Sequence, residues 1–204
     1  MKIPRRRAAR AAAALVAALN GTHHQIVIAG GLRRGEASVK DIDLVVQPII
    51  QATGFNLLEE PDQMVNLHWN RIHTLRNLGQ LRPRTGDNGR TQFGERFHTI
   101  WWDHEGETFP VDIHAVLPPA QFGVIAAIRT GPAEFSQFLV APKAKGGALP
   151  NGWVSRNGCL WDGDKPIVTP TEADLFEALG LPYIDARDRT AFIAAHRARY
   201  AYPL

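Results

Sequence analysis

Two aspartates and a glycine pair lie close together in the N-terminal part of the chain. Asp41 and Asp43 stand two residues apart in the run Asp-Ile-Asp-Leu-Val-Val, which favours a strand, so both carboxylates are expected on one of its faces. Upstream, Gly30 and Gly31 permit a close approach of the backbone to an anion, and an arginine pair that includes Arg34 can neutralise phosphate charge. Neighbouring carboxylates repel each other unless cations lie between them. The segment therefore indicates metal-assisted phosphoryl or nucleotidyl transfer.

A third carboxylate, Asp112, falls in a second apolar run, where apolar residues alternate with Asp112 and His114. A carboxylate on such a strand costs free energy unless it has a partner. A metal shared with Asp41 and Asp43 would be one partner, and an arginine or a position at the rim is the alternative. We expect the three aspartates to hold two Mg²⁺ ions, for which Mn²⁺ substitutes, because oxygen ligands suit these ions.

The run Gly30-Gly-Leu-Arg-Arg-Gly followed by Asp41-Ile-Asp43 resembles the palm signature of nucleotidyltransferases in its family X DNA polymerase (polymerase beta-like) form. The segment Val111-Asp112-Ile113 resembles the strand of the third carboxylate in that family. Further on, Ile128-Arg-Thr-Gly-Pro is similar to the family's segment of two aromatics, Thr or Ser, and Gly, which packs against the incoming nucleotide. The resemblance covers nearly the whole chain but lacks the family's lyase and fingers helix-hairpin-helix regions.

The resemblance implies a role for each matched residue. It assigns catalysis and metal binding to Asp41, Asp43 and Asp112. It places the nucleotide against Gly30, Gly31, Arg34, Lys40, Ile128, Arg129, Thr130, Gly131 and Ser136. Contacts to DNA are expected from the basic residues Arg82, Arg84, Lys143 and Lys145.

The chain departs from the family pattern at positions that contact the nucleotide. Gly31 stands where the family usually has serine, and Ile128 and Arg129 replace the two aromatics beside the sugar. Pro110 stands where a basic residue is common, and Ser136 where a base-contacting asparagine is common. These departures affect the choice of nucleotide more than catalysis, so ribonucleotides are candidate substrates.

The resemblance implies a minimal DNA-directed DNA polymerase that adds deoxynucleotides to a primer 3′-hydroxyl by two-metal nucleotidyl transfer, in repair or gap filling. Its partners would be primer-template or gapped DNA and dNTP. Without fingers, the alternative is a template-independent terminal transferase, or a nucleotidyltransferase that acts on RNA, small-molecule or protein acceptors. A nucleic-acid-binding module without catalysis is the third possibility, and the intact aspartates argue against it.

Composition is that of a globular protein. Of 204 residues, 45% are hydrophobic and 21% are charged, which excludes a disordered chain. The net charge of +3 and the isoelectric point near 9.3 suit a polyanionic partner. A single cysteine, Cys159, excludes an internal disulfide and indicates a reducing compartment.

The N-terminal segment has a charged and then an apolar part, as a signal peptide does. It is alanine-rich, however, and ends at Asn20-Gly21 like a capped helix. No apolar run is long enough to span a membrane. We therefore expect a monomeric cytoplasmic protein without membrane contact, bacterial or phage-encoded.

The pattern of elements predicts an α+β fold. We expect a nucleotidyltransferase palm, a mixed sheet with flanking helices, over residues 1–117, and a small α/β thumb-like nucleotide-binding subdomain over 118–204. Helices are predicted over 6–19, 47–53, 62–78, 118–129, 133–140 and 188–200, and over a segment with a capping box at Thr169 and Glu172 that ends at Gly180. Strands are predicted over 25–29, 42–46, 55–59, 91–102, 108–116, 153–160 and 165–168, with a polar loop over 80–89.

Overall fold

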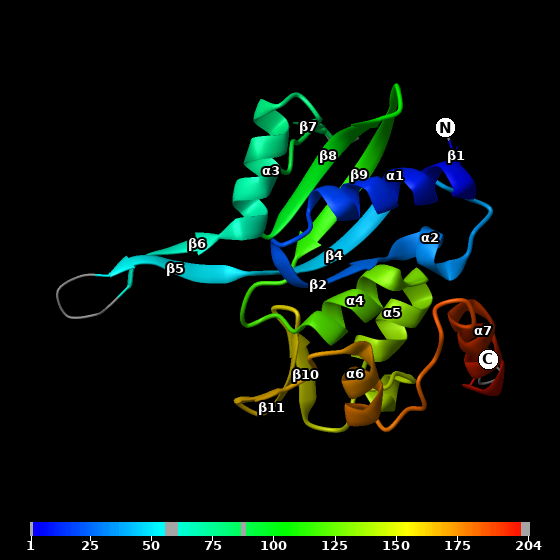
Figure 1. The fold of residues 1–204 in the computed structure, drawn as a ribbon. Coiled ribbons are helices and arrows are strands. Elements are labelled where there is room, and N and C mark those ends of the chain that lie inside the picture. The colour runs from blue at the N-terminus through cyan, green and yellow to red at the C-terminus, as the bar shows by residue number, and fades with distance from the viewer. Residues whose placement is uncertain (1, 56–60, 87–88, 201–204) are drawn as a thin grey trace.

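The computed structural model describes residues 2–55, 61–86 and 89–200, which form a mixed α+β fold (Figure 1). Its largest element is a five-stranded sheet with the spatial order β2 (His23–Ile28), β4 (Ile42–Pro48), β9 (Glu107–Ala115), β8 (Phe97–His104) and β7 (Leu81–Pro83). Strands β4 and β9 run parallel, whereas the other neighbouring pairs are antiparallel. The sheet is therefore mixed and flanked by helices, as the sequence predicted.

The first part of the chain also contains the helices α1 (Arg5–Ala18), α2 (Gly30–Arg34) and α3 (Leu67–Asn77). Two small antiparallel pairs are β1 (Ile3–Pro4) with β3 (Ser38–Val39), and β5 (Ile50–Phe55) with β6 (Pro61–Asn66). The β5–β6 pair projects from the body of the molecule as an arm (Figure 1).

The later part of the chain is mostly helical, with α4 (Phe122–Thr130), α5 (Ala133–Val140), the 3-10 turn η1 (Lys143–Lys145), α6 (Glu172–Ala178) and α7 (Arg189–Tyr200). Between η1 and α6 lies a small antiparallel sheet of β10 (Trp153–Arg156), β11 (Cys159–Asp162) and β12 (Lys165–Ile167). Asn157 and Gly158 turn the chain between β10 and β11 with φ of 53° and 72°, as a two-residue hairpin requires.

One face of the central sheet packs against α1 and α3. Because side chains alternate along a strand, Ile42, Leu44 and Val46 of β4 all point to this face, and each is fully buried. They share a hydrophobic cluster with Leu15 and the buried alanines of α1 and with Ile72 of α3. The small alanine side chains let α1 lie close to the sheet.

The opposite face of the sheet carries Asp43 and Val45, and α4 covers only part of it. Phe122 and Ala126 of α4 pack with Val45. Other residues of α4, such as Val124, belong to a second cluster formed with α5, α6 and α7. Since α4 contributes to clusters on both sides, the subdomain boundary expected after residue 117 stays a prediction.

A buried ion network connects α2 with the last part of the chain. The fully buried Arg189 donates to Glu172 Oε1 at 2.9 Å and to the carbonyl oxygens of Ile184 at 3.2 Å and Ala127 at 3.4 Å. The other carboxylate oxygen of Glu172 accepts from Arg33 of α2. Each charged group has a partner, which is the condition under which buried charges are tolerated.

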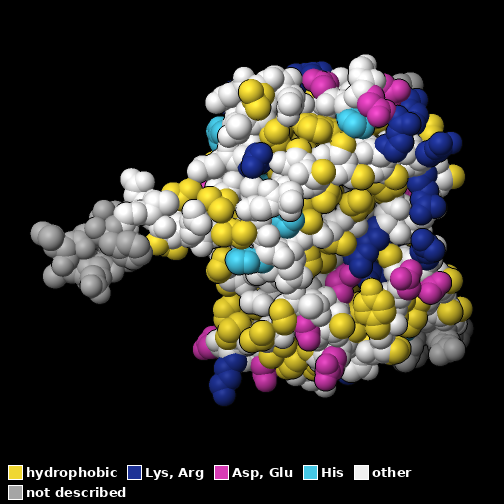
Figure 2. Space-filling model, viewed as in Figure 1, with side chains coloured by type: hydrophobic (Ala, Val, Ile, Leu, Met, Phe, Trp, Pro, Cys, Tyr) yellow, Lys and Arg dark blue, Asp and Glu magenta, His cyan; other side chains and the backbone are white. Residues whose placement is uncertain are grey.

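Basic side chains gather at one edge of the molecule, over the β1 end of α1 and over α2 (Figure 2). Arg5, Arg6, Arg7 and Arg10 of α1 are exposed. Two of them pair with the β8–β9 hairpin: Arg7 with Glu107, the first residue of β9, and Arg10 with Glu105 in the turn. Exposed pairs of this kind contribute little to stability.

Most predicted elements are confirmed, with ends displaced by a few residues. The predicted segments 6–19, 25–29, 42–46, 108–116, 118–129, 133–140 and 188–200 correspond to α1, β2, β4, β9, α4, α5 and α7. The strand predicted over 91–102 begins only at Phe97 and runs to His104. It ends there because Glu105 and Gly106, with φ of 51° and 76°, form the turn to β9. Three residues of the predicted loop over 80–89 form the edge strand β7 instead.

The helix predicted over 47–53 is wrong. These residues complete β4 and then enter β5, which pairs with β6 in a register that joins Ile50 to Asn66. Hydrogen bonding across the hairpin, which a local pattern does not reveal, decides the structure here. Most of the strand predicted over 55–59 lies outside the described residues.

The helix predicted over 62–78 exists only in its later part, from Leu67. Asn66 caps it, because its side chain accepts from the Trp69 N–H at 3.0 Å. Met64, inside the predicted helix, lies on β6 instead and is 61% exposed.

The capping box of α6 uses other residues than the sequence predicted. Thr171 is the N-cap: its hydroxyl accepts from the Asp174 N–H at 3.3 Å, and the Asp174 carboxylate accepts from the Thr171 N–H at 2.8 Å. The sequence contains two overlapping Thr-x-x-acid patterns, Thr169 with Glu172 and Thr171 with Asp174. The predicted cap used the first of them, but the Glu172 carboxylate is bound by Arg33 and Arg189 in the ion network, and the second pattern forms the cap.

We expect Glu172→Ala to lower the free energy of unfolding by about 3–5 kcal/mol, because it leaves the buried Arg189 without its carboxylate. Glu177→Ala, on the same helix but exposed, is the matched control and should change that energy by less than about 0.5 kcal/mol. Urea unfolding followed by circular dichroism measures both. Equal losses in the two variants would contradict the importance of the network.

Candidate active site

Strands β4 and β9 bring the three aspartates singled out by the sequence together. Their parallel register pairs Asp43 with Asp112 directly. Asp41 stands two residues before Asp43, just ahead of β4, and its charge acts on both other carboxylates. The three side chains therefore gather where the beginning of β4 lies beside β9, and we call them the acidic cluster.

Helix α4 leaves this end of the sheet open. Phe122 and Ala126 cover Val45, two residues along β4 from Asp43. Arg129, in the last turn of α4, is exposed, and its positive charge acts on Asp43 and Asp112. The apolar part of α4 thus closes the sheet beside the acidic cluster, while its cationic end faces the cluster.

Burial and mutual repulsion make Asp43 hard to ionise. Burial raises the pKa of Asp43 from 3.8 to about 7, and the charges of Asp41 and Asp112 add to the rise, against the opposing effect of Arg129 and Arg34. Burial also raises the pKa of Asp112. Such a site gains more than an exposed one from a cation bound between its carboxylates.

Arg84 is the direct partner of Asp112. Its guanidinium donates to Asp112 Oδ1. Two hydrogen bonds with Thr99 of β8, each 2.8 Å long, fix the Arg84 backbone, and the guanidinium lies 5.8 Å from the centre of the Trp101 ring. The arginine partner that the sequence left open for Asp112 is therefore present, at a residue singled out for DNA contact.

The two glycines that begin α2 each lie against a carboxylate. Gly30 has a φ of +59°, and a Cβ on it would lie 1.9 Å from Asp43 Oδ2, so no larger residue fits. A Cβ on Gly31 would lie 2.7 Å from Glu36 Oε2. Serine, the residue usual in the family at this second position, would require the Glu36 side chain to move.

Thr130 joins the two arginines of α2 to α4. Its carbonyl oxygen accepts from Arg34, which also pairs with Glu36. Its hydroxyl accepts from Arg33 Nη1 at 2.9 Å, and the residue is fully buried. The Thr130 side chain is thus committed to the interior, while the neighbouring Gly131 lines the open site.

The acidic cluster opens into a cavity of about 370 Å³, a volume within the range of small-molecule sites. Its lining includes Asp41 and Asp43 together with most of the residues expected at the nucleotide: Gly30, Gly31, Arg34, Lys40, Ile128, Arg129, Gly131 and Ser136. Asp112 is not part of the lining. Sequence reasoning did not single out five further residues of the lining, Lys2, Glu36, Ser38, Val39 and Ala133.

The residues expected to contact DNA are spread over the molecule. Arg82 of β7 forms an exposed ion pair with Asp103 at 2.8 Å, whereas Arg84 lies in the acidic cluster. Lys143 and Lys145 are on η1, in the later part of the chain. The structure does not bring these four together, and their contact with DNA stays a prediction.

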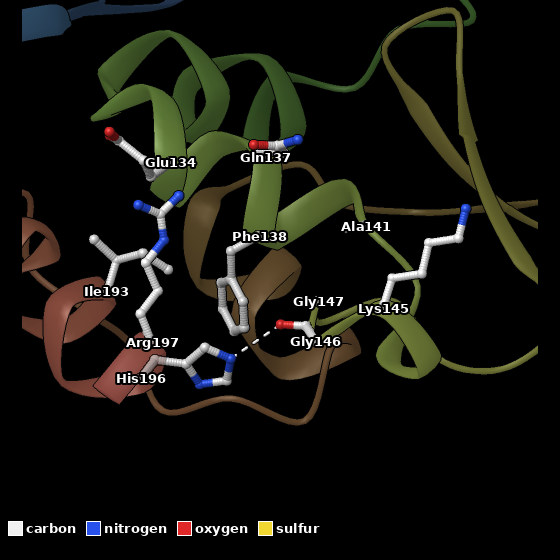
Figure 3. Close-up of a pocket in the computed structure, with 10 residues that line it drawn as sticks. All are labelled: Glu134, Gln137, Phe138, Ala141, Lys145, Gly146, Gly147, Ile193, His196 and Arg197. Atoms are coloured by element: carbon white, nitrogen blue, oxygen red, sulfur yellow. Dashed lines mark hydrogen bonds between the residues drawn. The ribbon is translucent and has the colours of Figure 1, made fainter. Parts of the chain in front are cut away.

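A larger cavity, of about 520 Å³, lies between α5, η1 and α7 (Figure 3). Lys145, Phe138 and His196 line it, and a ring nitrogen of His196 hydrogen-bonds to the Gly146 carbonyl oxygen at 3.0 Å. Among the described lining residues, Glu134 is the sole carboxylate. This cavity has no group of carboxylates, so the smaller cavity at the acidic cluster is the better candidate for phosphoryl chemistry.

Three buried histidines have packing roles. His114 stacks on Phe97 with ring centres 4.4 Å apart, and burial lowers its pKa to about 3. His68 and His98 are fully buried with their Nε2 atoms 3.4 Å apart, and burial lowers their pKa values to about 3 and about 4. Sequence reasoning missed this pair. A predicted start of α3 at Leu67 would have indicated that His68 is buried, because His68 then lies on the same face of the helix as the buried Ile72 and Leu75.

The chemistry of the acidic cluster suits Mg²⁺ or Mn²⁺, because its donors are carboxylate oxygens under strong mutual repulsion. Among the described residues, no three His, Cys, Asp or Glu side chains are already arranged to hold a metal ion. Asp112 is engaged with Arg84. A cation held by all three aspartates would therefore compete with Arg84 for Asp112.

No known protein-family model matches this chain. The resemblance to family X polymerases therefore rests on the sequence motifs alone. Within the described residues, none of the helices combines the length and the apolar character that crossing a bilayer requires.

We expect the contribution of Asp43 to the stability of the metal-free protein to fall as the pH rises from about 4 to about 7, whereas the three buried histidines act in the opposite sense. In this window the folded state keeps a proton on Asp43, whose pKa is about 7, while the unfolded state has lost it, so the Asp43 contribution to the free energy of unfolding decreases with pH, and comparison with a variant at Asp43 isolates it. Asp43→Asn cannot ionise and should be more stable than the wild type by about 2–4 kcal/mol at pH 8.

Urea unfolding with a chelator present, at several pH values, measures this difference, which should shrink toward zero near pH 4. Asp103→Asn, at an exposed ion pair, is the control. If the difference in stability between the wild type and Asp43→Asn is the same at all pH values, ionisation of Asp43 does not cause the pH dependence.

Proposed function

We propose that the chain is a minimal magnesium-dependent DNA polymerase that adds deoxynucleotides to a primer 3′-hydroxyl by nucleotidyl transfer. One observation supports this most: the carboxylates of Asp41, Asp43 and Asp112 gather where the beginning of β4 lies beside the parallel strand β9, next to a cavity lined by Gly30, Gly31 and Arg34. Bound Mg²⁺ would supply activation of the attacking hydroxyl and stabilisation of the departing pyrophosphate.

The positions of the three aspartates relative to the cavity indicate where the nucleotide and the primer would bind. Asp41 and Asp43 line the cavity, together with Gly30 and Arg34, so the triphosphate is expected there. Asp112 lies next to Asp43 but outside the lining. We therefore assign the side of Asp112 to the primer end, where the hydroxyl would approach the α-phosphate.

The selection of the sugar would depend on α4. Ile128 and Arg129 line the cavity where the family has two aromatics. An aliphatic and a long flexible side chain present no flat surface to the sugar. This favours a site that also accepts ribonucleotides.

A template-independent terminal transferase is the second candidate. It is favoured by the engagement of two arginines expected at DNA, since Arg82 pairs with Asp103 and Arg84 with Asp112. Acceptors other than DNA, such as RNA, a small molecule or a protein, belong to the same alternative, because the transfer chemistry at the acidic cluster is identical.

We expect Asp112→Ala to reduce magnesium-dependent primer extension at least about a thousandfold, since it removes a ligand of the ion at the attacking hydroxyl. Asp164→Ala, an exposed aspartate in the turn between β11 and β12 and outside the cavity, should retain wild-type activity. A gel assay with a labelled primer measures extension, and thermal melting verifies that both variants fold. Full activity in Asp112→Ala would refute the metal assignment.

Gapped and single-stranded DNA distinguish the two candidate functions. With each nucleotide offered alone, we expect a gapped substrate to be extended mainly by the complementary nucleotide. We also expect the ribonucleotide to be incorporated at a rate within about tenfold of that of the deoxynucleotide, a ratio that corresponds to about 1.4 kcal/mol in activation free energy. Addition of all four nucleotides to a single strand, without regard to a template, would support the terminal transferase instead.

A further inference from the structure

The two-stranded pair β1–β3 fixes the beginning of the described chain at the edge of the cavity. Ile3 lies opposite Val39 in its register, and the Arg5 N–H donates to the Ala37 carbonyl oxygen at 2.9 Å. Ile3 also packs against the main hydrophobic cluster. As a result Lys2, which no motif in the sequence singled out, lines the cavity of the acidic cluster.

The cations of this cavity differ in what they already bind. Those in its lining are Lys2, Arg34, Lys40 and Arg129. Arg34 is shared between Glu36 and a carbonyl oxygen, and the charge of Arg129 acts on the acidic cluster. The side chains of Lys2 and Lys40 are exposed, and within the described part of the chain neither has an ion pair or a hydrogen bond. Two ammonium groups are thus available to an anion that enters the cavity.

The negative charge of a triphosphate requires more positive charge than Arg34 alone can supply. Arg34 already compensates Glu36, and the first phosphate must approach three carboxylates. The distal phosphates carry most of the negative charge of the nucleotide. Lysine ammonium groups are compact and mobile, and they bind phosphate as point charges.

We propose that Lys2, acting with Lys40, contacts the distal phosphates of a nucleoside triphosphate in this cavity, an inference that rests on the proposed function of the site. The strand pair β1–β3 is then part of the nucleotide site, since it holds Lys2 in place. The contact distinguishes triphosphates from monophosphates, because a monophosphate leaves the distal positions empty.

The test compares the affinities of a nucleoside triphosphate and of the matching monophosphate, measured by titration calorimetry with Mg²⁺ and without primer. Lys2→Ala should weaken triphosphate binding about five- to tenfold, the loss of one charge-assisted hydrogen bond. It should leave monophosphate binding unchanged. Lys2→Arg should retain most of the triphosphate affinity. Lys165→Ala, an exposed lysine of β12 outside the cavity, is the matched control.

Two results would overturn the proposal: unchanged triphosphate affinity in Lys2→Ala, or an equal loss of affinity for both nucleotides. A wild-type protein that binds no triphosphate would refute the proposed function itself. Wild-type affinity therefore separates that failure from a failure of the Lys2 assignment.

Discussion

Repulsion among three carboxylates is the constraint on which the rest of the site depends. Parallel pairing of β4 and β9 fixes Asp43 beside Asp112, and burial with Asp41 nearby raises the pKa of Asp43 to about 7. The surroundings relieve this in two ways: Gly30 makes room for the Asp43 side chain, and arginines from separate segments supply positive charge. Groups with pKa values displaced this far are concentrated at functional sites. The displaced pKa of Asp43 thus supports the cation binding that we propose for the cluster.

The arrangement around the cluster is maintained by contacts between distant parts of the chain. Thr130 receives both arginines of α2, Arg33 through its hydroxyl and Arg34 through its carbonyl oxygen. Arg33 then continues to Glu172, and Glu172 to the buried Arg189. Because α2 begins at the glycines of the cavity and the last turn of α4 carries Arg129, this network holds the two walls of the site together. The ion pairs of this network hold α2, α4 and α6 together in the interior, and their hydrogen bonds fix the relative orientation of these helices.

Local sequence patterns predicted the strands and most helices that build the site, because alternation along β4 and β9 reflects burial on one face. They failed at residues 47–53, where pairing with β6 decides the structure. They also could not reveal the partner of Asp112 or the place of Lys2. Arg84 meets Asp112 only because the edge strand β7 joins the sheet, and Lys2 reaches the cavity only through β1–β3. Both contacts join segments far apart in the sequence and leave no local periodicity.

The pair of Arg84 and Asp112 gives the acidic cluster a particular electrostatic character. Since Arg84 already compensates Asp112, a divalent ion that binds there replaces one cation by another. The electrostatic stabilisation gained from such an ion is therefore smaller at Asp112 than at Asp43. Asp43 has no ion-pair partner among the described residues, and its pKa is raised to about 7. The part of the cluster that lines the cavity therefore attracts a cation most strongly. Under the proposed function, Asp112 would have to leave Arg84 to bind a metal ion, so recruitment of an ion on the primer side would be coupled to the position of Arg84.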